Sequence, residues 1–113
     1  MMNNRTIAII DYQMSNLFSI SNALNKLGIN SVITSDPKVI LQADGAILPG
    51  VGSYPEAIKN LHELGLFEVI NSFISSGKPF MGICLGLQLL FSHSEEFGLS
   101  KGFEIIKGRV NNF

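Results

Sequence analysis

The ten residues from Pro79 to Gln88 restrict the fold of this chain more than any other stretch. They form a short apolar run that ends at the single cysteine, and the apolar positions of a helix follow at once. Gly82 and Gly86 flank Cys84 with the G-x-C-x-G spacing of a nucleophile elbow. Small residues allow a sharp turn there, so the sulfur should project from the strand tip towards the positive end of the helix. We expect this thiol to ionise more readily than a free one.

The rest of the chain alternates between short apolar runs and segments of helical periodicity. A run such as Thr6–Ile10 has apolar residues at successive positions, as strands buried on both faces do. In the helical segments, apolar residues recur every three or four positions, and a glycine closes three of them. We expect strands at residues 6–10, 31–34, 44–48 and 79–83 and one or two within 102–110, with helices at 17–27, from 37 onward, at 53–64, at 66–76 and from 85 to about 93.

This alternation predicts an α/β fold, a three-layer α/β/α arrangement with a mainly parallel sheet and helices on both faces. In such sheets, ligands bind outside the carboxyl ends of the strands. Three features follow strand ends here: the turn Asp11–Asn16, the glycine loop Gly50–Gly52, and Cys84. We therefore expect one site where these three features meet.

Composition limits the function classes. The 113 residues suit one domain, and charged residues make up 15%, below the roughly 25% of soluble domains. We therefore expect further apolar burial, by a partner chain or by C-terminal sequence. The net charge of −1 gives no case for nucleic acid or an anionic membrane, and no apolar run is long enough for a membrane span. A single cysteine forms no internal disulfide, so we expect a cytoplasmic protein. No metal-ligand spacing occurs, and we expect no cofactor.

Each candidate residue has a structural alternative. Cys84 could be a small buried hydrophobe, but its flanking glycines favour a nucleophile. The loop Gly50-Val51-Gly52 could be a simple strand-to-helix turn, or its backbone N–H groups could face a ligand. Paired with the N–H of Leu85, one of them would make an oxyanion hole. Gln88 lies one helical turn beyond Cys84, where it could contact a substrate or face solvent.

The remaining polar residues favour structural roles when judged from the residues alone. Asp11 and Asn16 are typical turn formers, and Glu95 and Glu96 are typical of surface charge. His62 has charged neighbours in its helix, so we expect it at the surface. His93 lies nine residues past Cys84 and is a poor candidate for its general base.

The motif Gly82–Gln88, preceded by Pro49–Gly52, resembles the class I (triad) glutamine amidotransferases. The chain is most similar to the glutaminase subunits of imidazole glycerol phosphate synthases, because residues 10–17 and 89–96 also resemble them. The resemblance implies that Cys84 attacks the side-chain amide of glutamine, releases ammonia and forms a glutamyl thioester. It also implies an oxyanion hole from the backbone of Val51 and Leu85, and contacts to glutamine from Gly50, Gly52, Gln88 and Glu96.

The same resemblance implies a partner, a (β/α)8-barrel cyclase subunit that receives the ammonia for histidine biosynthesis. Asn16 would lie near that interface. The family usually has glycines at the positions of Gln13 and Ser15, and this departure is compatible with a paralogue that serves amidation of a surface-polysaccharide sugar.

The resemblance covers the N-terminal part of such a domain, with the oxyanion loop and the elbow inside residues 1–113. The family's catalytic His-x-Glu motif does not occur in these residues. A cysteine nucleophile needs a base, so we expect the 113-residue chain alone to be inactive and the domain to be incomplete at its C-terminus. Two alternatives stay open: a truncated, non-catalytic module that binds a synthase subunit, and a different cysteine hydrolase or redox protein on a similar fold.

Overall fold

The main sheet has four parallel strands. The computed structural model describes residues 5–13, 17–50 and 53–83, together with the strands 91–94, 100–101 and 106–110. The strands lie in the order β2-β1-β3-β4, and each neighbouring pair is parallel. Their bounds are β1 Thr6–Ile10, β2 Asn30–Thr34, β3 Gly45–Leu48 and β4 Phe80–Gly82. The predicted parallel sheet is therefore confirmed.

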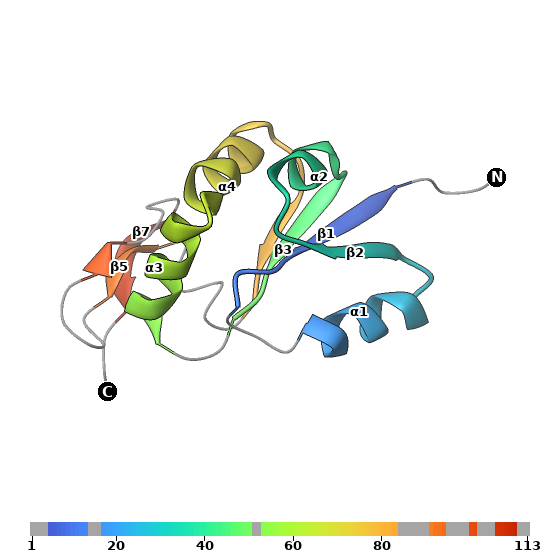
Figure 1. Cartoon of the computed structure of the whole chain (residues 1–113), viewed down its shortest axis with the longest axis horizontal. Helices are drawn as coiled ribbons and strands as arrows, with labels where there is room; N and C mark the ends of the chain where they lie inside the picture. Colours follow the sequence, from blue (N-terminus) through green and yellow to red (C-terminus); the bar gives the residue numbers. More distant parts are fainter. Residues whose placement is uncertain are drawn as a thin grey trace.

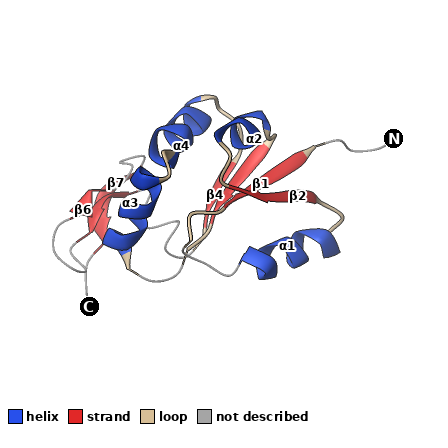
Figure 2. Ribbon diagram, viewed as in Figure 1, coloured by secondary structure: helices blue, strands red, loops and turns tan. Residues whose placement is uncertain are grey.

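Among the described residues, four helices cover the two faces of this sheet (Figures 1 and 2). On one side lies α1, and on the other side lie α2 and α4, with α3 following the glycine loop. Their bounds are α1 Leu17–Lys26, α2 Pro37–Gln42, α3 Tyr54–Glu63 and α4 Leu66–Ser75. Alternate residues of β1 and β3 pack with the apolar faces of α2, α3 and α4 in one core. This is the expected three-layer α/β/α fold. In the described segments, no helix is long and apolar enough to cross a membrane.

Local sequence signals set the ends of these helices. The Asp36 carboxylate accepts a hydrogen bond of 2.9 Å from the Lys38 N–H, and the Ser53 hydroxyl accepts one of 3.2 Å from the Glu56 N–H. Both side chains therefore act as N-caps. Glycines follow α1, α3 and α4 with positive φ angles, which a residue without a Cβ adopts without strain. They are Gly28 (75°), Gly65 (70°) and Gly77 (83°).

The sequence prediction was wrong at the far end of the elbow helix. We expected that helix to run to about His93, but Phe91–Ser94 is a strand, β5, in a second sheet. It pairs antiparallel with β6 (Ser100–Lys101) and parallel with β7 (Ile106–Val110). A short segment with a single large apolar residue, Phe91, does not by itself distinguish a helix from a strand, and pairing with two neighbours decides for the strand here. In the described part of the segment expected within 102–110, β7 continues through Gly108.

Large apolar side chains remain exposed on the α1 side of the sheet. No residue of α1 is buried, and the side chains of Phe18 and Leu27 are 74% and 73% exposed. Met81 is 58% exposed on β4, the strand at one end of the four-stranded sheet. By contrast, the apolar side chains that form the core under α2, α3 and α4 are buried. This asymmetry fits the apolar excess of the composition.

Candidate active site

The carboxyl ends of three neighbouring strands bring the predicted site segments together. Because β3 lies between β1 and β4, the glycine loop starts between the turn after β1 and the residue that follows β4. The three strands are parallel, so these segments emerge at the same edge of the sheet. The described residues at this edge are Asp11–Gln13, Pro49–Gly50 and Ile83, and the expected meeting with Cys84 stays a prediction because Cys84 lies outside the described residues.

The start of the glycine loop is held tightly against β4. Pro49 and Gly50 are both buried directly after β3. The Ile83 N–H donates a hydrogen bond of 3.0 Å to the Leu48 carbonyl, which extends the β3–β4 pairing by one residue. Ile83 is the residue immediately before Cys84. The backbone that leads to the cysteine is thus fixed relative to the backbone that leads into the loop.

Tyr12 links the turn after β1 to the same loop, and the sequence prediction missed it. Its side chain is 1% exposed, and its hydroxyl donates a hydrogen bond to the Pro49 carbonyl. Its own carbonyl accepts a hydrogen bond of 3.2 Å from the side-chain amide of Asn60 in α3. Burial raises the pKa of the Tyr12 phenol well above its ordinary value, so the hydroxyl stays a donor. A tyrosine inside a turn with several polar residues was the signal that could have indicated burial with a partner.

The turn itself has an unusual backbone at Gln13. The Asp11 carboxylate accepts a hydrogen bond of 3.2 Å from the Gln13 N–H, which confirms the expected turn-forming role of Asp11. Gln13 has a φ of 70°, in the left-handed region that favours glycine. Gln13, one of the two positions where the resemblance implies a glycine, therefore has a backbone conformation that favours glycine.

Tyr54 begins α3 on the other side of the glycine loop. Its ring is fully buried in the core, next to the N-cap residue Ser53. Its hydroxyl has no hydrogen-bond partner among the residues that the structure describes. Burial raises the pKa of Tyr54 to about 12. Both tyrosines are thus fully buried, but only the Tyr12 hydroxyl bonds a described residue, the Pro49 carbonyl.

Neither histidine lies among the described residues of the site edge. His62 is exposed on α3, as expected, and its ring stacks on Phe67 with the ring centroids 4.4 Å apart. His93 is part of β5, opposite Lys101 and Arg109. Of the predicted site residues, Gly50 is described and buried. Outside the described residues lie Asn16, Val51, Gly52, Cys84, Leu85, Gln88, Glu95 and Glu96.

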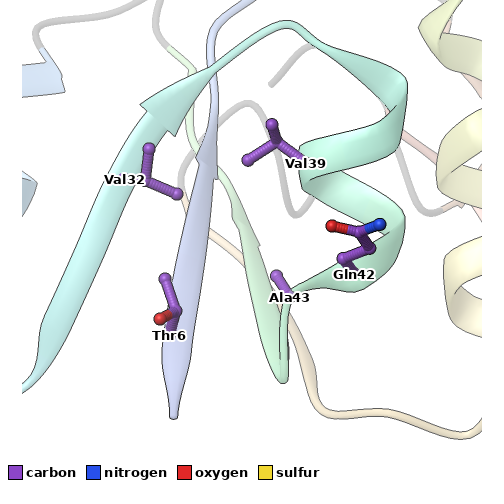
Figure 3. Close-up of a pocket in the computed structure, with 5 residues that line it drawn as sticks. All are labelled: Thr6, Val32, Val39, Gln42 and Ala43. Atoms are coloured by element: carbon purple, nitrogen blue, oxygen red, sulfur yellow. The ribbon is translucent and has the colours of Figure 1, made fainter. Parts of the chain in front are cut away.

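A pocket of about 230 Å³ lies away from this edge (Figure 3). It sits between α2 and the strands β1 and β2, near the amino end of β1. Its lining is uncharged, and its volume is below the roughly 300 Å³ of the smallest usual ligand sites. We assign no ligand to it. The lining residues are Thr6, Val32, Val39, Gln42 and Ala43. Within the described segments, no group of three His, Cys, Asp or Glu side chains could hold a metal ion.

Comparison with known proteins identifies the family. The glutamine amidotransferase class-I family matches residues 8–110, which is most of the chain. The chain belongs to the class I glutamine amidotransferases. The chain is 49% identical over 108 residues to the imidazole glycerol phosphate synthase subunit HisH of Geobacter metallireducens. It is 51% identical over 107 residues to the subunit of the same name from Sulfurimonas denitrificans.

These matches cover 96% and 95% of the amidotransferase chain but 51% and 52% of the two relatives. The chain therefore spans about half the length of the curated relatives it matches. The family match over residues 8–110 includes both the glycine loop and the elbow residues. The resemblance inferred from the motifs is thus confirmed at the level of the family.

Solved structures agree on the fold of this amidotransferase. A glutamine amidotransferase crystal structure superimposes with a TM-score of 0.77 at 17% identity, over 93% of this chain and 55% of that one. The structure of a putative peptidase E protein from Listeria monocytogenes gives a TM-score of 0.66, also at 17% identity, over 80% of this chain and 51% of that one. The second neighbour has a different named function, so the fold alone does not decide the reaction.

Proposed function

We propose that the full-length protein is the glutaminase subunit of an imidazole glycerol phosphate synthase. The observation that carries this proposal is the identity of about one half, over nearly all of the chain, to two subunits of that name. The parallel pairing of β3 with β4 supports this proposal, since the strand that leads into the loop and the elbow strand end side by side.

In the proposed reaction, the Cys84 thiolate attacks the side-chain amide carbon of glutamine and forms a C–S bond. The carbonyl oxygen becomes an oxyanion, and the C–N bond then breaks as the nitrogen takes up a proton and leaves as ammonia. Water hydrolyses the glutamyl thioester to glutamate and restores the thiol. Residues 1–113 contain no His-x-Glu, so we propose that the base belongs to the full-length protein outside them and that the isolated 113-residue chain is inactive.

The strand arrangement supports the roles proposed for the loop residues. The backbone N–H groups of Val51 and Leu85 would stabilise the oxyanion, one from the segment after β3 and one from the segment after β4. Adjacent parallel strands are a suitable support for two such donors, since their ends lie about 4.8 Å apart. Glutamine would be held by the remaining predicted residues, which are Gly50, Gly52, Gln88 and Glu96.

The proposed partner is a cyclase subunit with a (β/α)8-barrel fold, which receives the ammonia in a cytoplasmic heterodimer. Asn16 is proposed to lie near the interface. It belongs to the turn after β1, and this turn shares the site edge of the sheet with the glycine loop. A partner bound there would lie close to the place where ammonia is released.

The proposal is tested with the full-length protein and a synthase cyclase subunit. Glutamate release from glutamine should depend on Cys84 and fall to background in Cys84→Ser. A glutamine-analogue electrophile should form an adduct that peptide mapping locates at Cys84. Full glutaminase activity in Cys84→Ser would refute the assignment of the nucleophile. A wild-type protein that binds the cyclase but releases no glutamate would instead indicate a non-catalytic binding module.

The ammonia acceptor needs a separate measurement. In the proposed complex, glutamine should replace added ammonia in the cyclase reaction. Glutamine hydrolysis that never supports the cyclase would favour the paralogue that serves amidation of a surface-polysaccharide sugar. The substitution of the family's usual glycine by Gln13 is the observation that motivates this second candidate.

A further inference from the structure

Tyr12 fixes the orientation of the peptide group between Pro49 and Gly50. The proline ring already restricts φ of Pro49 to about −65°. The Tyr12 hydroxyl bonds the carbonyl oxygen of the same residue, which also restricts its ψ. The peptide unit is planar, so anchoring the oxygen also sets the direction of the Gly50 N–H. Both backbone torsions of Pro49 are therefore restricted at the start of the glycine loop, although the next residue is a glycine.

The anchor is itself held from the opposite side. The Asn60 side chain in α3 donates to the Tyr12 carbonyl at 3.2 Å. The helix α3 starts directly after the loop, so Asn60 ties the turn after β1 to the element that the loop leads into. Tyr12 and Pro49 are both almost completely buried, so water cannot easily replace the hydrogen bond between them.

We propose that Tyr12 is a positioning residue for the glycine loop: its hydroxyl fixes the Pro49–Gly50 peptide group, from which the backbone continues to the proposed oxyanion donor at Val51. This inference rests on the proposed glutaminase function and deepens it. Tyr12 touches no reacting atom in this scheme and acts through the Pro49 carbonyl. Misalignment of an oxyanion donor weakens transition-state stabilisation more than it weakens substrate binding. Loss of the hydroxyl should therefore lower kcat and leave KM nearly unchanged.

Tyr54 offers a matched control. It is also a fully buried tyrosine beside the loop, but no described residue bonds its hydroxyl. Tyr12→Phe and Tyr54→Phe each remove one oxygen and leave the ring in the core. A general effect of a changed core would appear in both variants. An effect of the anchor would appear in Tyr12→Phe alone.

The test uses the full-length protein with its cyclase subunit. We expect Tyr12→Phe to lower kcat for glutamine hydrolysis about tenfold with KM within twofold, and Tyr54→Phe to keep kcat within twofold. Alkylation of Cys84 by iodoacetamide needs a thiolate but no oxyanion hole, so its rate should change less than twofold in both variants. Equal kcat values for wild type and Tyr12→Phe, or equal losses in the two variants, would overturn the proposal.

Hydrogen exchange separates this proposal from the proposed function. The peptide containing residues 49–52 should exchange its amide hydrogens faster in Tyr12→Phe than in Tyr54→Phe or wild type, whether or not the protein hydrolyses glutamine. Faster exchange together with an inactive wild type would keep the anchor but refute the glutaminase function and, with it, a catalytic role for the anchor. Unchanged exchange in Tyr12→Phe would refute the anchor itself.

Discussion

Ile7 and Gly45 lie opposite each other in the register of β1 and β3, and a Cβ at Gly45 would be 2.9 Å from Cδ1 of Ile7. The same Cβ would be 3.4 Å from the Pro79 carbonyl oxygen. The absence of a side chain at Gly45 therefore lets β3 fit between its two neighbours. The register of β3 with β4, with Leu48 opposite Gly82, sets the ends of these two strands side by side where the loop begins.

Replacing Gly45 by alanine should lower the free energy of unfolding by about 1–2 kcal/mol, because overpacking forces the Ile7 side chain to move. Chemical denaturation of the full-length protein measures this change. Ile7→Val removes the Cδ1 atom in the way, so the double variant should regain part of the loss. Equal destabilisation by Gly45→Ala in the two backgrounds would show that the backbone, and not Ile7, resists the added methyl group.

Gln13 should be a site where glycine stabilises the protein. A side chain at a φ of 70° costs about 1–2 kcal/mol, and the greater freedom of glycine in the unfolded chain offsets about 0.5–1 kcal/mol of that. We expect Gln13→Gly to raise the free energy of unfolding by about 0.5–1 kcal/mol. Gln13→Ala keeps the strained backbone and serves as the control, which should change stability little. A destabilised Gln13→Gly would mean that the glutamine side chain makes a compensating contact.

The Lys78 side chain caps the C-terminal end of α2. Its ammonium donates to the carbonyls of Leu41 (2.8 Å) and Ala43 (3.0 Å) and lies 5.4 Å from the ring centroid of Phe73. Lys78→Met keeps the aliphatic stem but removes both donors, so we expect a loss of about 1–2 kcal/mol in thermal or chemical unfolding.

Lys59 is the control for this change. Its ion pair with Glu63 is long, at 3.9 Å, and both side chains are mostly exposed. Lys59→Met should therefore cost less than about 0.5 kcal/mol. Similar losses in the two lysine variants would argue that the effect at Lys78 comes from net charge and not from the cap.

Local signals in the sequence predicted much of the fold. The caps Asp36 and Ser53 and the closing glycines depend on neighbours within a few residues, so the order of strands and helices could be deduced without tertiary information. The strand β5 could not be deduced from local signals in this way. Phe91 continues the apolar positions of Leu89 and Leu90, and the choice between helix and strand depends on pairing with β7, more than ten residues later.

The candidate site shows the same division. The glycine loop and the elbow are contiguous motifs, and the strand order of a parallel sheet puts the strands that lead to them, β3 and β4, next to each other. The link from Tyr12 to Pro49 joins residues that are 37 positions apart, and the link from Asn60 to Tyr12 spans 48 positions. No local sequence pattern encodes such contacts. A residue that anchors a distant carbonyl can therefore be identified from the structure but not from the sequence.

The buried tyrosines should make the protein sensitive to alkaline pH. Burial raises the pKa of Tyr54 to about 12 and that of Tyr12 further, whereas an unfolded phenol ionises near pH 10. Above pH 10 the unfolded chain loses these protons first, so the stabilising contribution, complete below pH 10, is lost as the pH rises towards the folded pKa. We expect each tyrosine to cost about 1 kcal/mol of unfolding free energy between pH 9 and pH 11. Tyr12→Phe and Tyr54→Phe should each flatten this decline in denaturant unfolding, and curves parallel to wild type would show that the phenols ionise equally in the folded and unfolded chains.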